Sequence, residues 1–477
     1  MAALPVLSVA SEAVPLVKTG GLADVVGALP AALIPEDVGM QIILPAYPGL
    51  LPRLTSPKVV WDDPDLFGGP ARVLRGVVEG TTFLLLDAPH LYDRQGGIYA
   101  GANGDYPDNP ERFAALSWAA AQIAMRGTSD GWRPRILHAH DWQGGLAPAY
   151  LRYAGSDVKS VLTIHNIAFQ GNAPADRLAA LRLPASEFHR EGLEYWGGIS
   201  TLKAGLVTAD ALTTVSPTYA EELMRPQFGM GLEGVVASRA DVLHGILNGV
   251  DEAVWSPGAD PAILRDYGPA SLARKAQNRA ALLAEFGLSE LPGPLAIVVS
   301  RLTHQKGIDL LAETMPAFIA AGGGLVLLGS GEPALEAGMR DLAARHPDRV
   351  GVRIGYDEAL SHRMFAGGDA ILVPSRFEPC GLTQMYGLRY GAVPVVAATG
   401  GLNDTVIGLT PAAEAVATGI SFHPVDATAF AAALRRLSAL YADRAGWTAL
   451  VRRAMKAQVG WQEPAGQYAA LYRNLLT

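Results

Sequence analysis

Short apolar runs alternate along the chain with longer stretches whose apolar residues recur at helical spacing. The first run covers residues 4–10, and the stretch after it places on one helix face Leu22, Val25, Val26, Leu29 and Leu33. Strands that alternate with helices are typical of parallel sheets of the doubly wound type. Further strands are predicted at Gln41–Leu44, Thr82–Leu86, Ile136–His138, Lys159–Ile164, Ala211–Val215, Ala296–Ser300, Leu325–Leu328, Val350–Ile354, Ala370–Val373 and Val393–Ala397.

This pattern occurs in two blocks, one that ends near residue 245 and one that begins near Leu295. The stretch between them, from Asn248 to Gly258, is rich in turn residues, and we interpret it as a hinge. We therefore predict two domains, residues 1–247 and 248–456. The last residues, about 457–477, indicate an amphipathic helix that packs back on the first domain.

Two Gly-Gly turns resemble each other. Residues 19–26 (TGGLADVV) and 399–406 (TGGLNDTV) share the Thr, both glycines, the Leu, the Asp and the final Val, and both precede helical patterns. Any turn from a strand into a helix can have such a sequence; alternatively, two similar folds face each other across a cleft. In open α/β sheets these turns lie at the carboxyl ends of strands, where ligands bind.

The composition narrows the classes of function. Of 477 residues, 49% are hydrophobic and 18% charged, which fits two or three folded domains and excludes a disordered chain. The net charge of −8 argues against nucleic acid binding, so local cations must hold any anionic ligand. The single Cys excludes an intramolecular disulfide, and no apolar run approaches the ~20 residues that span a bilayer. We expect a soluble, cytoplasmic protein.

Two turns that contain cations are candidate phosphate sites. Lys18 and the glycines at 20–21 follow the first strand and open a helix, where free N–H groups and positive charge suit a phosphate. Arg301 and Lys306 follow the strand Ala296–Ser300, and two cations at this spacing can reach one pyrophosphate. The alternative for each turn is an ordinary solvated surface.

A third candidate is the segment Phe377–Thr383. Pro379 is predicted near the start of a helix, which leaves the N–H groups of residues 381–383 free for a phosphate or a sugar hydroxyl. Glu378 directly precedes that helix, so its carboxylate faces the same point. The alternative role of Glu378 is to stabilise the helix N-terminus by its charge.

Other motifs argue against competing chemistries. Residues 329–334 fit the dinucleotide fingerprint G-x-G-x-x-A, but they lie deep in the second block, where an NAD site is not expected. His138, His140 and His165 end strands of the first block, yet no Cys cluster or HExxH accompanies them, so no metal site is predicted. The absence of G-x-S-x-G argues against an α/β-hydrolase.

Taken together, these motifs resemble those of the bacterial and plant starch and glycogen synthases. The resemblance covers nearly the whole chain and rests on segments in a fixed order: residues 18–25 (KTGGLADV), 138–142 (HAHDW), 165–171 (HNIAFQG), 300–307 (SRLTHQKG) and 374–382 (PSRFEPCGL). Each segment is weak evidence alone, but the ordered set is specific.

The resemblance implies a GT-B fold, in which two Rossmann-like, doubly wound α/β domains face each other across a deep cleft. It implies that residues 1–247 bind the glucan acceptor and residues 248–456 the nucleotide-sugar donor. The implied reaction transfers glucose from ADP-glucose to the non-reducing end of an α-1,4-glucan such as glycogen, with retention of configuration. No metal or cofactor is implied, and neither nucleic acid nor a membrane is an expected partner.

The resemblance also implies the residues of the site. Donor contacts are implied for Lys18, Gly20, Gly21, Asn248, Arg301, Lys306, Tyr356, Cys380, Gly381, Leu382 and Thr383. Catalytic roles are implied for Glu378, His165, Lys18, Arg301 and Lys306, and acceptor binding for Glu12, Tyr99, Asp141 and Trp142. In this scheme Arg301 and Lys306 hold the pyrophosphate and Tyr356 stacks on the base. The glucose is contacted by His165, Asn248 and Glu378.

One departure from related enzymes and several alternatives stay open. Many related retaining transferases have a second Glu eight residues after the first, where this chain has Tyr386; bacterial synthases commonly lack it. The residues alone do not settle whether the donor is ADP-glucose or UDP-glucose. The remaining alternatives are another retaining GT-B transferase and a catalytically inactive glucan-binding protein.

Overall fold

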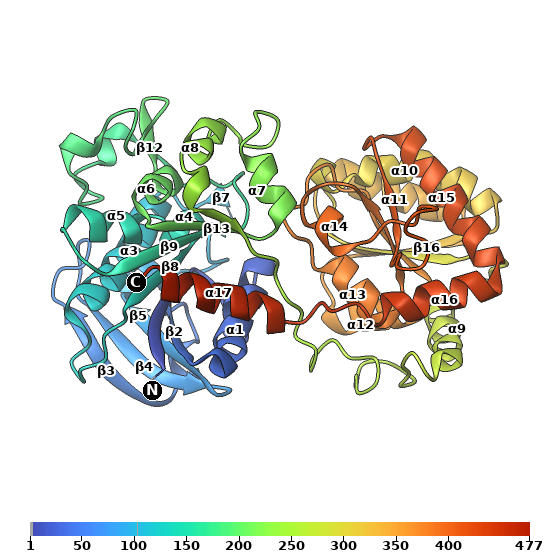
Figure 1. Ribbon diagram of the computed structural model, residues 1–477, viewed down its shortest axis with the longest axis horizontal. Coiled ribbons are helices and arrows are strands. Elements are labelled where there is room, and N and C mark those ends of the chain that lie inside the picture. The colour runs from blue at the N-terminus through green and yellow to red at the C-terminus, as the bar shows by residue number, and fades with distance from the viewer. Residues whose placement is uncertain (1–2, 103) are drawn as a thin grey trace. The chain divides into compact units, whose positions relative to one another are not determined.

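The protein divides into two compact units, which we describe one at a time. The computed structural model describes residues 3–102 and 104–477. The first unit contains the chain up to Asn248 together with Trp461–Thr477, and the second unit is Gly249–Gly460. Each unit has a large β-sheet and surrounding helices (Figure 1).

The first unit is built around a nine-stranded sheet in the order β14-β13-β9-β8-β1-β2-β5-β4-β3. β1 pairs in parallel with β2 on one side and with β8 on the other. Val6, Leu7 and Val9 of β1 are fully buried, as expected for a strand covered on both faces. The strands are β1 Leu4–Val9, β2 Val38–Pro45, β3 Thr55–Asp63, β4 Ala71–Val78, β5 Thr81–Asp87, β8 Ile136–His140, β9 Lys159–Ile164, β13 Ala211–Thr214 and β14 Leu243–Gly245.

Two strands at one edge of this sheet did not follow from the apolar pattern. β3 pairs antiparallel with β4, and β4 pairs antiparallel with β5. In β4, buried Ala71 and Val73 flank exposed Arg72, an alternation typical of a strand with one solvated face. The sheet is therefore parallel at its centre, as predicted, and antiparallel at this edge.

Helices cover both faces of the first sheet. On one face α3 (Asn109–Arg126) packs on α5 (Leu146–Tyr153), which packs on α6 (Thr201–Thr208). On the other, α1 (Gly21–Leu33, blue) and α17 (Gln462–Asn474, red) lie side by side (Figure 1). Their shared core joins apolar side chains of both helices to the sheet and includes Val6, Val25, Leu29, Ile136, Val161, Tyr468 and Tyr472. The end of the chain thus completes the core of the first unit.

The second unit is built on six parallel strands in the order β17-β16-β15-β18-β19-β20. The strands are β15 Leu295–Val299, β16 Gly324–Gly329, β17 Val350–Ile354, β18 Ala370–Val373, β19 Val393–Ala397 and β20 Ile420–Phe422. Almost every residue of β15, β16, β18 and β19 is buried, which explains why these strands are short continuous apolar runs in the sequence, whereas the edge strand β17 contains the exposed Arg353.

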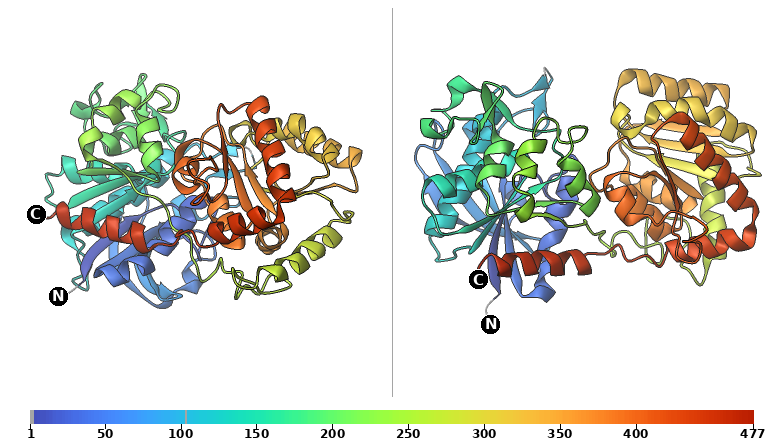
Figure 2. Two further views of the ribbon diagram at one scale, coloured as in Figure 1. Left: turned by 45° about the vertical axis from the view of Figure 1, so that its right-hand side comes forward. Right: turned by 45° about the horizontal axis from the view of Figure 1, so that its top comes forward.

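Two groups of helices flank the second sheet (Figure 2). One group contains α10 (Ile308–Ala320), α11 (Pro333–Arg345) and α15 (Ala427–Ala442). The other contains α9 (Lys275–Glu285), α12 (Glu358–Gly367), α13 (Thr383–Tyr390) and α16 (Arg444–Ala454). This is a doubly wound arrangement, as the alternating pattern predicted.

The strands predicted from apolar runs are all present, with ends that differ by up to three residues. Lys159–Ile164 coincides with β9, whereas Gln41–Leu44 lies inside the longer β2. Backbone pairing sets the ends of a strand and hydropathy does not, so the predicted ends fall inside some strands, such as β2, and beyond others, such as β13. Among the described residues, no helix is long and apolar enough to cross a membrane.

Tyr472 links α17 to the sheet by a hydrogen bond as well as by packing. Its Oη lies 2.7 Å from His138 Nδ1, and both side chains are fully buried. Tyr472→Phe would leave that nitrogen without a partner, so we expect the free energy of unfolding to fall by about 1–3 kcal/mol in chemical denaturation. The control is Tyr153→Phe, because the buried Tyr153 hydroxyl has no partner among the described residues. Equal losses in the two variants would contradict this role of the hydrogen bond.

Candidate functional site

In each sheet there is one point where the strand order reverses, and predicted site residues follow the strands at that point. The reversal lies between β1 and β8 in the first unit and between β15 and β18 in the second. Ligands of open α/β sheets bind beyond the carboxyl ends of the strands at such points. The turns after these four strands contain Glu12, Lys18, Asp141, Arg301, Lys306 and Glu378.

In the first unit, the Glu12 carboxylate organises the turn after β1. It accepts hydrogen bonds from the backbone N–H of Thr19, from the N–H of Gly20 at 3.2 Å and from Thr19 Oγ1 at 2.7 Å. Glu12 itself is only 3% exposed. The protein therefore uses the N–H groups of Thr19 and Gly20, just before α1, and the phosphate site at this turn stays a prediction.

Lys18 and Gly21 lie at the start of α1, which begins at Gly21 after the extended residue Gly20. Lys18 Nζ lies 2.8 Å from Asp24 Oδ1, and both side chains are partly exposed. The positive charge predicted for this turn is present, but Asp24 partly balances it. The donor contacts of Lys18, Gly20 and Gly21 stay predictions.

Tyr99 is held beside Glu12. Its Oη lies 3.0 Å from Glu12 Oε1 and 2.7 Å from Ser11 Oγ. Burial first, and then the Glu12 charge, raise the pKa of Tyr99 well above its ordinary value, so the hydroxyl stays protonated and donates to the carboxylate. Two predicted acceptor residues thus bind each other, and an acceptor sugar would have to replace these bonds.

Asp141 begins the turn after β8 and has a backbone φ of +49°. Its Oδ1 accepts hydrogen bonds from the backbone N–H groups of His165 at 2.7 Å and Asn166 at 3.3 Å. Burial raises the pKa of Asp141 to about 7, although these two N–H groups act in the opposite direction. Asp141 therefore joins the turn after β8 to the turn after β9, and it titrates close to neutral pH.

Trp142 and Asn248 are two further predicted site residues of the first unit. The Trp142 ring packs edge-on against Phe113, with centroids 4.9 Å apart. Asn248 is 7% exposed, and its Oδ1 has no hydrogen-bond partner within the described part of the chain. A buried amide oxygen without a partner costs about 1–3 kcal/mol, which is typical of a group that binds a ligand or water.

In the second unit, Lys306 and Glu378 form an ion pair between the turns after β15 and β18. Lys306 Nζ donates to Glu378 Oε2 at 2.5 Å, and Ser375 Oγ donates to the same oxygen at 2.9 Å. The Glu378 side chain is 8% exposed and that of Lys306 17%. Lys306 is therefore not the independent charge that the sequence indicated. Its ammonium has three donors, so two stay available to another ligand.

Arg301 supplies a second cation to this unit. The residue is exposed, and its guanidinium makes no hydrogen bond or ion pair with any residue that the structure describes. A guanidinium presents donors in a fork that suits two oxygens of a phosphate. Arg301 therefore has the properties of an anion ligand.

The segment before α13 presents three backbone N–H groups. Those of Gly381, Leu382 and Thr383 have no acceptor among the residues described. Gly381 has a φ of +72°, which glycine adopts at little cost. The sequence predicts Pro379 near the start of this helix, but α13 begins later, at Thr383. Gln384 Nε2 binds the carbonyls of Cys380 (3.0 Å) and Gly381 (2.9 Å) and holds a separate loop there.

The second Gly-Gly turn supports this loop. The Gly401 N–H donates to the carbonyls of Glu378 at 3.0 Å and Pro379 at 3.1 Å. A Cβ at Gly401 would lie 2.4 Å from the Cα of buried Cys380, so only glycine allows this close approach. The two similar Gly-Gly sequences thus start two helices but have different tasks: Glu12 binds the first, and the second packs on the loop around Cys380.

Tyr356 follows β17 and is 74% exposed. Its hydroxyl donates to the Glu358 carboxylate, which fixes the ring while its surface stays accessible. An exposed, fixed ring suits stacking on a planar base. The stacking role that the resemblance implies for Tyr356 stays a prediction.

Tyr386 stands where many related enzymes have a second Glu. Its ring stacks on Trp255 with centroids 3.7 Å apart and an interplanar angle of 11°. Trp255 also stacks on His362, with centroids 4.0 Å apart. Tyr386 therefore packs α13 against the segment that follows Gly249, and it provides no carboxylate.

Sequence reasoning missed three residues that support the site. Ser375 binds Glu378, Trp255 stacks on Tyr386, and Ser8 lies 3.1 Å from the His140 ring. The available signal for Ser8 was a polar residue inside the otherwise apolar run Leu4–Val9. Trp255 gave no signal, because its partner Tyr386 belongs to another element. Ser375 lies three residues before Glu378 in the same segment, but its residue type alone does not indicate that it binds the carboxylate.

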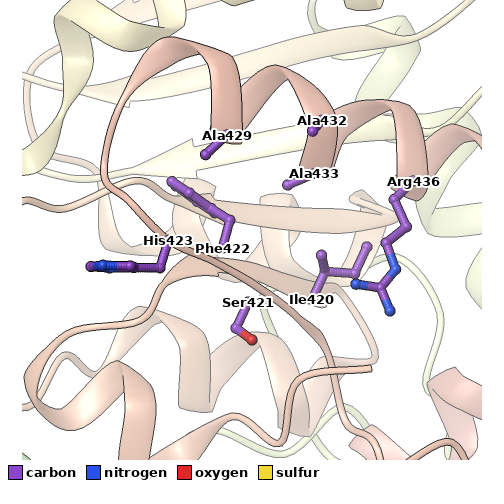
Figure 3. Close-up of a pocket in the computed structure, with 8 residues that line it drawn as sticks. All are labelled: Ile420, Ser421, Phe422, His423, Ala429, Ala432, Ala433 and Arg436. Carbon is purple, nitrogen blue, oxygen red and sulfur yellow. The ribbon is translucent and has the colours of Figure 1, made fainter. Parts of the chain in front are cut away.

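A cavity of about 290 Å³ lies between β20 and α15 in the second unit (Figure 3). Its lining includes Ser421, His423, Ala433 and Arg436, and none of the predicted site residues. The Arg436 guanidinium donates to the carbonyl of Leu409, so this cation stabilises the fold.

Among the described residues, no group of three or more His, Cys, Asp or Glu side chains could hold a metal ion.

Comparisons with protein families agree on both units. Residues 5–238 match the family model described as starch synthase catalytic domain. Residues 293–439 match the model described as glycosyl transferases group 1.

Full-length relatives give the same result. A glycogen synthase of Cereibacter sphaeroides is 65% identical, and the match covers 99% of this chain and 98% of that protein. A glycogen synthase of Paracoccus denitrificans is 59% identical over 98% of this chain and 99% of that protein. The catalytic domain of starch synthase IV from Arabidopsis thaliana, solved with ADP and acarbose, has a TM-score of 0.90 and 31% identity over 99% of each chain.

The raised pKa of Asp141 predicts a dependence of stability on pH. Its folded-state pKa lies above the ordinary value of 3.8, so the folded state binds the extra proton more tightly. This contribution to stability is complete below about pH 4 and is lost as the pH rises through about 7. Asp141→Asn keeps an oxygen for the two N–H groups, tolerates the positive φ and removes the titration.

We therefore compare the free energy of unfolding of Asp141→Asn with that of the unchanged protein. We expect the difference, variant minus unchanged protein, to rise by roughly 2 kcal/mol from pH 5 to pH 8. Chemical denaturation at both pH values measures the difference. A difference that is the same at pH 5 and pH 8 would show that Asp141 does not titrate in this range.

Gly401 gives a prediction about the loop of the second unit. Gly401→Ala forces Cβ against the backbone of Cys380, so we expect a loss of about 1–3 kcal/mol and weaker binding of ADP in calorimetry. The matched control is Gly338→Ala inside α11, where the added methyl meets nothing within 4 Å. That variant should be as stable as the unchanged protein or up to about 1 kcal/mol more stable. Unchanged ADP binding by Gly401→Ala would separate this loop from the donor site.

Proposed function

The chain belongs to the starch and glycogen synthase family of glycosyltransferases, and from this membership we propose that it transfers glucose from ADP-glucose to the non-reducing end of an α-1,4-glucan with retention of configuration. The family and the glycogen synthase activity follow from relatives 53–65% identical over almost the full length. The donor nucleotide, the acceptor end and the roles of individual residues are the proposed parts.

The single observation that carries the donor proposal is the set of anion-binding groups after β15 and β18. Among the described residues, the Arg301 guanidinium has no partner, Lys306 has two donors without an acceptor, and the N–H groups of residues 381–383 lack acceptors. A leaving diphosphate gains negative charge in the transition state, and preorganised donors stabilise that charge where it develops. No metal is needed for this stabilisation, and we propose that the reaction requires none.

One solved relative supports the proposal of an adenine nucleotide donor. The starch synthase IV catalytic domain at 31% identity was solved with ADP. In this chain, the exposed ring of Tyr356 follows β17, two strands away from β15 in the same sheet, and we propose that the adenine stacks on it. UDP-glucose is the alternative donor, and the assay below separates the two.

Three groups are proposed to contact the transferred glucose. Asn248 has a buried amide oxygen without a partner among the residues that the structure describes, and a sugar hydroxyl can satisfy it. Glu378 and His165 each have one edge bound by the protein, at 2.5 Å from Lys306 Nζ and 3.0 Å from His140 Nδ1. Groups that are held in this way are preorganised for a ligand.

The environment of Glu378 supports transfer without a covalent glucosyl-enzyme intermediate. Lys306 and Ser375 both donate to Glu378 Oε2. Donors on a carboxylate stabilise its charge and so reduce its reactivity as a nucleophile. We propose that Glu378 orients the sugar and stabilises the positive charge that develops on it, while the acceptor hydroxyl attacks from the face that the diphosphate leaves.

The acceptor residues divide into two kinds. Glu12 and Tyr99 hold each other and the turn after β1, so we propose a supporting role for them. Asp141 has one carboxylate oxygen beyond the bonds from His165 and Asn166, and Trp142 is partly exposed. We propose that Asp141 and Trp142 contact the glucan.

The test is transfer of labelled glucose from ADP-glucose, and separately from UDP-glucose, onto glycogen in the presence of a chelator. We expect incorporation from ADP-glucose, with α-1,4 linkages in the product. Incorporation from UDP-glucose alone would overturn the donor proposal, and activity only after a divalent cation is added would overturn metal independence. If neither donor is used while glycogen still binds, the chain is an inactive glucan-binding protein.

The proposed role of Glu378 predicts the behaviour of Glu378→Gln. We expect kcat to fall by about 100-fold, because the amide lacks the charge that stabilises the transition state. The dissociation constant of ADP should stay within about threefold, because the free N–H groups and Arg301 remain. Arg301→Ala is the matched control and should weaken ADP binding more than Glu378→Gln does. The reverse order of effects on ADP binding would assign Glu378 to the nucleotide.

A further inference from the structure

Ser8, His140 and His165 form a row of hydrogen-bonded side chains in the first unit. His140 ends β8, Ser8 lies in the adjacent strand β1, and His165 follows β9 on the other side. His140 Nε2 lies 3.1 Å from Ser8 Oγ, and His140 Nδ1 lies 3.0 Å from His165 Nε2. Both nitrogens of His140 are therefore occupied within the protein.

Both imidazoles are neutral. Burial lowers the pKa of His165 to about 3. Burial first, and then the neighbouring His138 and His165, hold the pKa of His140 well below its ordinary value. A neutral imidazole has one N–H, so a single proton lies between His140 Nδ1 and His165 Nε2 and belongs to one of them.

Ser8 determines which nitrogen has that proton. The residue is fully buried, and among the described residues its hydroxyl has His140 Nε2 as its hydrogen-bond partner. A buried hydroxyl hydrogen without an acceptor is costly, so Ser8 donates to Nε2. His140 Nε2 then has no hydrogen, and His140 is protonated at Nδ1 and donates to His165 Nε2.

We infer that Ser8 and His140 are positioning residues that fix His165 as the tautomer protonated at Nδ1. The His165 side chain is partly exposed, and its Nδ1 has no partner in the part of the chain that the structure describes. His165 thus presents a fixed N–H donor. It can donate to an oxygen of the transferred glucose, but it cannot accept a hydrogen bond from a glucose hydroxyl. That the ligand is glucose rests on the proposed function, whereas the tautomer rests on the geometry alone.

His138 serves as an internal comparison. It is also fully buried in β8, but it binds Tyr472 Oη at 2.7 Å and Thr163 Oγ1 at 2.6 Å. It makes no hydrogen bond to His165 among the described residues. Substitution of His138 therefore reports the general cost of losing a buried His from this strand.

The first experiment reads the tautomer directly. Two-bond ¹H–¹⁵N correlation spectra of ¹⁵N-histidine-labelled protein distinguish a ring protonated at Nδ1 from one protonated at Nε2. The His165 signals are assigned by their loss in His165→Asn. We expect protonation at Nδ1 in the unchanged protein and a mixture of tautomers in Ser8→Ala. Protonation of His165 at Nε2 in the unchanged protein would overturn the inference.

The second experiment uses two substitutions of one residue. His140→Asn places an amide near the position of the His140 Nδ1 atom, where it can still donate to His165. His140→Gln places its amide near the position of the His140 Nε2 atom, where it reaches Ser8 only. We expect kcat to fall by about tenfold in His140→Gln, with the KM for glycogen little changed, and to stay within about threefold in His140→Asn. Equal losses in the two variants, or the same loss in His138→Gln, would assign His140 a purely structural role.

The outcomes separate this inference from the proposed function. If the unchanged protein transfers no glucose from ADP-glucose, the donor proposal fails, but the spectra still establish the tautomer of His165. If transfer proceeds and the spectra show Nε2 protonation, the proposed function stands and the positioning role of Ser8 and His140 fails.

Discussion

The parallel pairing of β15 with β18 is the contact on which the site of the second unit depends. Ile297 and Ile371 are register partners, so the turns that follow the two strands leave the same edge of the sheet side by side. Lys306 and Glu378, 72 residues apart in the sequence, can therefore share one hydrogen bond. In the first unit, the pairing of β8 with β1 and β9 brings together Ser8, His140 and His165 in the same way.

Most polar groups predicted to bind a ligand already have partners in the protein. Glu12 binds the turn before α1, and Lys306 binds Glu378. A buried charge without a partner is costly, so a site that must fold without its ligand pairs its charges internally. Within the described residues, the predicted groups without partners are either exposed, as is the Arg301 guanidinium, or uncharged, as are the Asn248 oxygen and the N–H groups of residues 381–383. Such groups are tolerable in the free protein.

The contacts of α13 and its preceding loop explain why the proposed site of the second unit contains one carboxylate. Tyr386 stacks on Trp255, and the Gly401 N–H holds the carbonyls of Glu378 and Pro379. The backbone of the loop is thus fixed from two sides, and Glu378 is oriented by Lys306 and Ser375. This fixed arrangement is the basis of the proposal that Glu378 acts by electrostatic stabilisation.

The sequence by itself determined the doubly wound class, the central strands, the family and most of the side chains at the reversal points, because apolar periodicity and short turn motifs are local properties of the chain. The tertiary structure alone decided which of these side chains pair. Glu12 binds the turn that contains Lys18, Lys306 binds Glu378, and Ser8 orders the two histidines. It also decided the antiparallel edge β3–β4 and the place of α17 on α1. Except for the Glu12 contacts, which lie within one turn, these contacts join residues distant in the sequence, and strand register, which no local pattern encodes, sets which of them meet.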